Sequence, residues 1–160
     1  MTKKYIKNFM FRDKQALMSI SRCGHVSHDE LKNFVKDSRI KNYCRDGLVQ
    51  REVFNTTNGE QLIGYKLTKE GKSFIEKNYG FTGHQHPQSL IHDLGISDKY
   101  FSLKEVERET WRTETQLRDQ FQEELDKLRN TEVDRFNELY DMIKNRELSM
   151  PDCSYTSETG

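Results

Sequence analysis

The sequence predicts a mainly α-helical fold with one small β-ribbon, and three observations lead to this prediction. Residues 38–71 carry, in order, the signals of a helix, a tight turn, a two-stranded ribbon and the start of another helix. Residues 102–147 contain neither proline nor glycine, which favours a long helix. Only 33% of the residues are hydrophobic and 32% are charged, so the core is small and much of the chain faces water or a partner.

Two helices are expected before residue 38. Residues 12–23 have an apolar stripe with helical spacing. Ser27 and Glu30 have the spacing of a capping box, in which each residue satisfies a free N–H group at the start of a helix. The apolar positions are Ala16, Leu17 and Ile20 in the first helix and Leu31, Phe34 and Val35 in the second.

A third helix and a β-ribbon follow. Asp37 or Ser38 is a suitable cap for the helix, and Gly47 suits the left-handed residue that ends it. Residues 48–54 and 61–67 are rich in strand-forming side chains. The loop over residues 55–60 contains an Asn-Gly pair, which tolerates the positive φ angles of a hairpin.

A fourth helix starts directly after the ribbon. Thr68 is its expected N-cap, and Gly71 allows it to approach the ribbon closely. The order helix, helix, helix, ribbon, helix is that of a winged helix-turn-helix domain. We therefore expect such a domain over residues 1–80, followed by a long coiled-coil-like helix.

The polar side of the third helix and the wing are the expected contacts with double-stranded DNA. Arginine recognises guanine edges and asparagine recognises adenine edges in the major groove, whereas a wing suits the DNA backbone or the minor groove. A terminal arm with Lys3, Lys4 and Lys7 either adds to this surface or is a solvated, poorly ordered end. The expected contacts are Arg39, Lys41, Asn42 and Arg45 on the helix, and Arg51, Asn55, Thr57, Asn58 and Gln61 on or beside the wing.

The net charge of zero conceals two halves of opposite sign. Residues 1–80 hold 16 Lys and Arg against 9 Asp and Glu, a net +7, and residues 81–160 hold 10 against 17, a net −7. A cationic domain attracts a phosphate backbone through counterion release. The acidic half repels nucleic acid and favours another contact, such as self-association.

A His-rich connecting loop is expected over residues 81–101. His84, His86 and His92 lie there, but no His or Cys spacing matches a closed zinc site, so we expect hydrogen bonds inside the protein and no metal. The three cysteines form no CxxC pair, and Cys23 beside His25 is too little for a catalytic dyad. Inert thiols and the lack of a signal peptide or membrane span indicate a cytoplasmic protein. We expect no cofactor.

The long helix over residues 102–147 needs a partner. If continuous, it extends about 69 Å, more than a small domain covers. Two arrangements are open: the same helix of another copy, or a break near Asn130 that folds the segment into a hairpin, with Thr131 and Asp134 as caps. We expect self-association into a dimer or higher oligomer, Trp111 as an anchor against the first domain, and a flexible tail over residues 148–160. The expected seam is Leu117, Phe121, Leu125, Leu128, Phe136, Leu139 and Ile143.

Several short motifs occur in a recognisable order: His92-Asp93-Leu94, then Trp111-Arg112-Thr113-Glu114, then Pro151-Asp152. Together with residues 12–79 they resemble the replication-relaxation family of winged-helix proteins encoded by plasmids, phages and integrative elements. The resemblance implies DNA binding linked to plasmid replication or mobilisation. Longer members carry further acidic positions in an arrangement similar to a restriction-endonuclease fold. Here no second acid-plus-lysine element follows Asp152, so we expect no enzyme.

These observations predict a sequence-specific DNA-binding protein of a mobile element that acts as an oligomer in transcription regulation or nucleoprotein assembly. An alternative is an inhibitor or adaptor whose acidic helical region captures a protein target, for example a host or phage-defence enzyme. A small nuclease or relaxase accessory enzyme is a third hypothesis.

Overall fold

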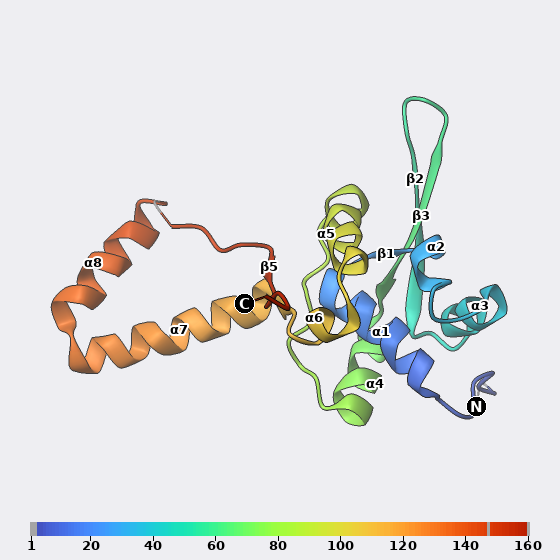
Figure 1. Ribbon diagram of the computed structural model, residues 1–160, viewed down its shortest axis with the longest axis horizontal. Coiled ribbons are helices and arrows are strands. Elements are labelled where there is room, and N and C mark those ends of the chain that lie inside the picture. The colour runs from blue at the N-terminus through green and yellow to red at the C-terminus, as the bar shows by residue number, and fades with distance from the viewer. Residues whose placement is uncertain (1–2, 147, 160) are drawn as a thin grey trace.

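The computed structural model describes residues 3–146 and 148–159, so the ends of the predicted ranges at residues 1, 2, 147 and 160 lie outside the described residues (Figure 1). The described chain is mainly helical with a small antiparallel sheet, as the sequence predicts. The helices are α1 (Phe11–Cys23), α2 (His28–Leu31), α3 (Asp37–Arg45), α4 (Lys69–Tyr79), α5 (Leu90–Ser102), α6 (Glu105–Glu109), α7 (Glu114–Thr131) and α8 (Val133–Lys144). The strands are β1 (Val26–Ser27), β2 (Val49–Asn55), β3 (Gln61–Leu67), β4 (Arg112–Thr113) and β5 (Cys153–Ser154).

Local capping chemistry sets most of the helix starts in the first half. Ser27 and Glu30 form the predicted capping box, and the Thr68 side chain accepts the Gly71 N–H at the start of α4. The predicted cap of α3 is wrong, because Lys36 occupies the N-cap position without a side-chain hydrogen bond. The Asp37 carboxylate is hydrogen-bonded instead to a histidine of α2, so the helix begins one residue earlier than a capping Asp would allow.

Strands β2 and β3 form a long ribbon, with β1 on the other edge of β3. The register runs from Val49 opposite Leu67 to Asn55 opposite Gln61. At the tip only Gly59 adopts a positive φ, 81°, so the loop does not use a two-residue Asn-Gly turn. The ribbon extends well beyond the helices (Figure 1).

The core lies between α1, α3, α4, α5 and the base of the ribbon. Tyr43, Leu17 and Ile20 are among its largest fully buried side chains. Gly71 confirms the predicted close approach, because a Cβ there would lie 2.0 Å from the Leu48 carbonyl oxygen.

The prediction of a connecting loop over residues 81–101 is wrong from residue 90 onward. The Ser89 hydroxyl accepts the His92 N–H and starts α5, whose side chains Leu90, Ile96 and Tyr100 are buried. Within the predicted loop only residues 81–89 are non-helical.

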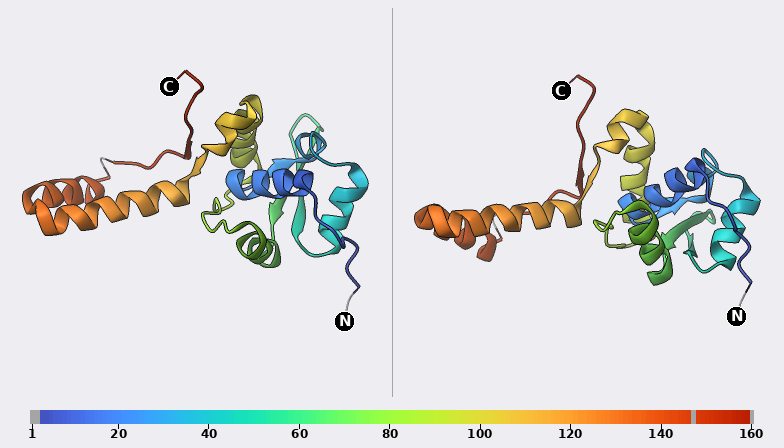
Figure 2. Two further views of the ribbon diagram at one scale, coloured as in Figure 1. Left: turned by 60° about the horizontal axis from the view of Figure 1, so that its bottom comes forward. Right: turned by 90° about the horizontal axis from the view of Figure 1, so that it is seen from below.

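The prediction of one helix over residues 102–147 is also wrong. The chain is extended at Leu103 (φ −87°, ψ 157°) and again at Thr113, whose side chain caps α7. Glu132 (φ −137°, ψ 78°) separates α7 from α8, close to the break near Asn130 that the hairpin arrangement requires, but neither Thr131 nor Asp134 is the cap of α8. Helices α7 and α8 form an arm, here called the C-terminal arm, that projects from the rest of the molecule in all three orientations (Figures 1 and 2).

The prediction of a flexible tail after residue 147 is wrong for its described part, residues 148–159. Its strand β5 pairs with β4, with Cys153 opposite Thr113 and Ser154 opposite Arg112, and the Tyr155 ring stacks on Trp111. Trp111 is 3% exposed and its Nε1 donates to a carbonyl of α1, which confirms the predicted anchor. None of the helices in the described ranges has the length and apolar character needed to span a membrane.

Candidate nucleic-acid interface

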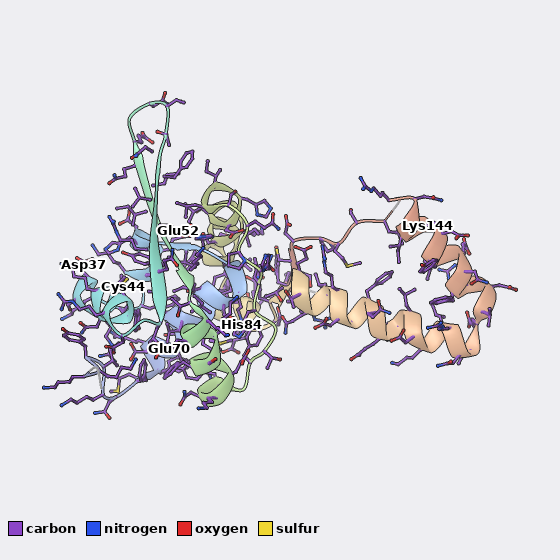
Figure 3. All side chains as sticks on the ribbon, turned by 180° about the vertical axis from the view of Figure 1, so that it is seen from behind. Asp37, Cys44, Glu52, Glu70, His84 and Lys144 are labelled. Atoms are coloured by element: carbon purple, nitrogen blue, oxygen red, sulfur yellow. The ribbon has the colours of Figure 1, made fainter. Side chains whose placement is uncertain are left out.

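Helix α3 turns one side to the core and the other to solvent. Tyr43 is fully buried, whereas Lys41 and Arg45 are exposed and Asn42 is half-buried. With Ser38, these polar residues occur at spacings of three and four, so they line one face of the helix. That face and the ribbon lie at the end of the molecule opposite the C-terminal arm; Figure 3 labels Asp37 and Cys44 at one end and Lys144 at the other.

Arg39 is committed to contacts inside the protein. Its Nε and Nη2 donate to the two carboxylate oxygens of Asp13 at 2.8 and 2.7 Å, and Nη2 also donates to the Asn8 carbonyl. Asp13 is 2% exposed and accepts hydrogen bonds from the Tyr43 hydroxyl and the Met10 N–H as well. Burial acts to raise the pKa of Asp13, but these hydrogen bonds outweigh it and lower the pKa. Arg39 therefore fastens α3 to α1. The other three predicted helix contacts lie on the solvent side of α3.

The N-terminal arm, residues 3–10, is docked beside the C-terminal end of α3. The Tyr5 and Ile6 N–H groups donate to the two carboxylate oxygens of the buried Asp46 at 2.8 and 2.9 Å. Lys4 Nζ donates to the Asp46 carbonyl at 2.9 Å, so this lysine faces the protein.

Two further lysines of the N-terminal arm, Lys3 and Lys7, are exposed. The Arg45 guanidinium lies 5.2 Å from the centroid of the Tyr5 ring, which is also exposed. The arm therefore places an aromatic ring next to Arg45 on the exposed face of α3, and its two free lysines face solvent.

The five predicted wing residues, Arg51, Asn55, Thr57, Asn58 and Gln61, are all exposed. Between residues 53 and 65 the sequence has no Lys or Arg and one acid, Glu60. The wing thus offers a cation at its base, and at its tip it offers amides, hydroxyls and the exposed carboxylate of Glu60.

A chain of ionisable side chains, not predicted from the sequence, fixes the base of the ribbon. His25 is 1% exposed, with Nδ1 2.6 Å from Asp93 Oδ2 of α5 and Nε2 2.8 Å from Glu52 Oε2 of β2. Lys66 of β3 pairs with Glu52 at 2.7 Å, and this hydrogen bond is the main reason that the pKa of Glu52 is lowered. His92 Nδ1 lies 3.0 Å from the second oxygen of Asp93. The ribbon is therefore tied to α5 through a buried histidine.

Two of the three histidines after α4 make hydrogen bonds inside the protein, as predicted. His84 Nδ1 lies 2.6 Å from Ser21 Oγ, and burial lowers the pKa of His84. The hydrogen bond with Asp93 is the main cause of the raised pKa of His92. His86 is exposed. No group of three or more His, Cys, Asp or Glu side chains within the described ranges is placed to hold a metal ion.

The structure brings the first and last of the motifs that carry the family resemblance together, through His92 and Asp152, whereas Glu114 of the second motif has a different partner. Glu114 pairs with Arg118 at 2.6 Å, whereas Asp152 lies 3.6 Å from His92. Comparison with the models of known protein families, with curated proteins and with solved structures finds no match to the chain. The resemblance to the replication-relaxation family therefore stays a prediction.

The predicted self-association residues lie on the C-terminal arm, which has an incomplete core. Leu125 is buried at 5% exposure and Ile143 is 38% exposed. The others are half-buried: Leu117, Phe121, Leu128, Phe136 and Leu139. Apart from β4 at its root, α7 makes its main contacts with α8.

Proposed function

We propose that the protein binds double-stranded DNA as a winged helix-turn-helix protein, with α3 in the major groove and the β2–β3 ribbon as the wing. The observation that carries this proposal is the polar stripe on α3, with exposed Lys41 and Arg45 and half-buried Asn42, at the end of the molecule away from the C-terminal arm. The half of the chain that contains this stripe has a net charge of +7. Such a surface gains affinity for DNA by releasing counterions from phosphates.

The exposed side chains take different roles in this proposal. Asn42 and Arg45 reach base edges, because an amide and a guanidinium match the hydrogen-bond patterns of adenine and guanine. Lys41, with Lys3 and Lys7 of the N-terminal arm, contacts phosphates. The wing tip approaches the DNA through amides and hydroxyls, since it has no cation. Arg39 orients α3 and does not read bases.

Binding selection from random duplexes tests the proposal and yields the preferred site. We expect Lys41→Ala with Arg45→Ala to lower affinity for the selected duplex by more than about tenfold, since each good base contact contributes about 1–3 kcal/mol. The double variant should also have a shallower dependence of log affinity on log salt, because phosphate contacts are lost. Lys127→Ala, an exposed lysine on the C-terminal arm, is the matched control. Equal affinity for the double variant and the control would contradict the proposal, as would a lack of binding by the unaltered protein at low salt.

We infer that the C-terminal arm joins two copies. A two-helix hairpin leaves one side of its apolar face open, and two such hairpins complete a four-helix bundle. A symmetric dimer would present two α3 helices to two half-sites. Such a protein would act as a transcription regulator or as an assembly factor for a nucleoprotein complex.

Sedimentation equilibrium measures this association. Ile143→Lys should convert the dimer to a monomer, whereas Val106→Lys, at an apolar position on α6 that is 55% exposed against 38% for Ile143, should leave it unchanged. A dimer that survives Ile143→Lys would place the interface elsewhere. A monomeric unaltered protein would contradict the inference and favour a different protein as the partner of the arm.

A further inference from the structure

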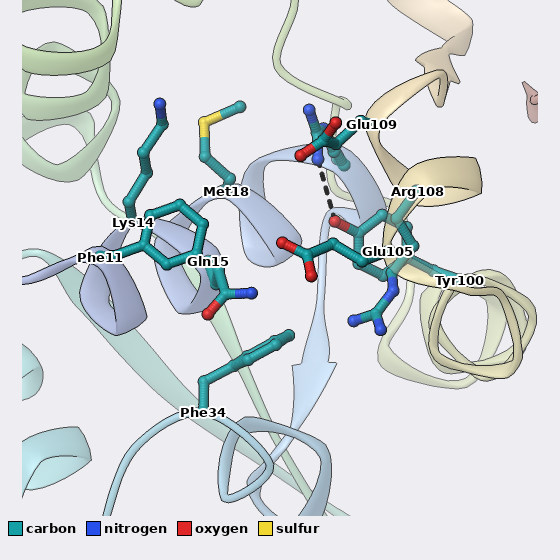
Figure 4. A pocket seen from close by; sticks show the side chains of 10 residues that line it. Phe11, Lys14, Gln15, Met18, Phe34, Tyr100, Glu105, Arg108 and Glu109 are labelled. Carbon is teal, nitrogen blue, oxygen red and sulfur yellow. Dashed lines mark hydrogen bonds between the residues drawn. The ribbon is translucent and has the colours of Figure 1, made fainter.

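A cavity of about 220 Å³ lies between α1, the segment before α3, and the α5–α6 region (Figure 4). Phe11, Met18, Phe34 and Tyr100 give it apolar and aromatic walls. Its volume suits a small organic molecule and not a nucleotide or a peptide. It lies outside the DNA-binding surface described above.

Two guanidinium groups line the cavity, and each has an Nε–H group without an acceptor. The Nε atoms of Arg22 and Arg108 are buried without a hydrogen-bond partner, and within the described ranges only two other buried side-chain atoms share this state. Arg22 Nη1 donates to the Tyr100 hydroxyl at 3.0 Å. The Arg108 guanidinium lies 5.8 Å from the Phe34 centroid and 5.9 Å from the Tyr100 centroid, so it lies beside two aromatic rings. A buried donor without an acceptor is costly, and a ligand that supplies one removes that cost.

The charges of the lining define the kind of ligand. Glu105 and Glu109 of α6 also line the cavity, but both are exposed, so water satisfies their oxygens. A ligand therefore has to supply hydrogen-bond acceptors to the two arginines, and it does not have to supply donors to the two acids. Lys14 and the two arginines give the lining three positive charges against two negative ones. This excess of one positive charge matches a ligand with a single negative charge and disfavours a polyanion.

We propose that this cavity binds a small aromatic monocarboxylate. The carboxylate is held by Arg108 and Arg22, since a guanidinium edge pairs with two carboxylate oxygens. The ring lies against Phe34 and Met18, where aromatic and sulfur contacts add to the burial of apolar area. Phe34 lies three residues before the start of α3, so the ligand touches the segment that leads into the proposed recognition helix.

Calorimetry on the full chain without DNA tests the proposal independently of the proposed function. The probes are benzoate and phenylacetate, with neutral benzamide and cationic benzylamine as matched ligands of the other charge classes. Trp111, the single tryptophan, gives a second readout, because its ring lies 5.1 Å from that of Tyr100. Either carboxylate should bind at least tenfold more tightly than benzamide and should alter the Trp111 emission. Benzylamine should not bind.

Variants locate the binding site. Arg108→Gln should weaken carboxylate binding at least tenfold, and Gln15→Phe, which places a ring in the cavity, should abolish it. Arg135→Gln, an exposed arginine on α8, is the control and should bind as the unaltered protein does. The proposal is overturned if neither carboxylate binds at millimolar concentration, if benzamide binds equally well, or if folded Arg108→Gln and Gln15→Phe variants retain the affinity.

Discussion

Replacing Arg39 with alanine separates a structural role of this side chain from a role in reading DNA. The substitution removes two hydrogen bonds to Asp13, of 2.8 and 2.7 Å, and one to the Asn8 carbonyl. Breaking a buried ion pair from one side costs about 3–5 kcal/mol. Here the Arg39 side chain is 28% exposed, and Tyr43 and the Met10 N–H still donate to Asp13. We therefore expect a loss of about 2–3 kcal/mol in the free energy of unfolding.

Urea unfolding followed by circular dichroism measures this loss. Arg45→Ala is the control, because an exposed substitution changes stability by less than about 0.5 kcal/mol. A double-mutant cycle with Asp13→Asn should return a coupling energy of about 2 kcal/mol. The reasoning is refuted if Arg39→Ala leaves stability within the range of the control while lowering DNA affinity as much as Arg45→Ala does, since Arg39 would then act as the base contact that its helix position suggests.

Three further predictions concern single contacts. Gly71→Ala should destabilise the protein by about 3 kcal/mol in the same assay, because the new Cβ would collide with the Leu48 carbonyl, and a neutral effect would show that α4 moves away easily. Asp93 raises the pKa of His92 above 6.5, so the stability from this contact is complete below pH 6.5 and is lost as the pH rises through the raised pKa. His92→Gln should flatten the stability profile over that range, and an unchanged slope would contradict the assignment. Asp46→Ala should speed amide hydrogen exchange in the N-terminal arm, and unaltered protection would mean that other contacts hold the arm.

The sequence predicts best those elements that are determined by neighbouring residues. Ser27 with Glu30, and Thr68 ahead of Gly71, act within one helical turn, so their chemistry is visible in the sequence. Helix α5 has the same kind of start at Ser89, yet its sequence favours a loop, because His92 and Gly95 interrupt its apolar pattern.

Contacts between distant residues explain the remaining differences. The helical wheel places Arg39 on the polar side of α3, but nothing local shows that Asp13, 26 positions earlier, captures it. His25 similarly meets partners 27 and 68 positions away. Helix propensity alone favours one continuous helix after residue 102, and the chain breaks at Thr113 because that residue pairs with Cys153.

The pairing of β4 with β5 gives the second half of the chain an unexpected construction. The polypeptide leaves the body after Thr113 and returns to the adjacent position at Cys153, so the whole arm is inserted between two neighbouring strands. A short flexible linker in place of residues 119–150 would close this gap and keep Trp111 and Tyr155 stacked. Removal of the arm should therefore leave the domain that carries it intact, because the two strands that bracket the arm already pair with each other.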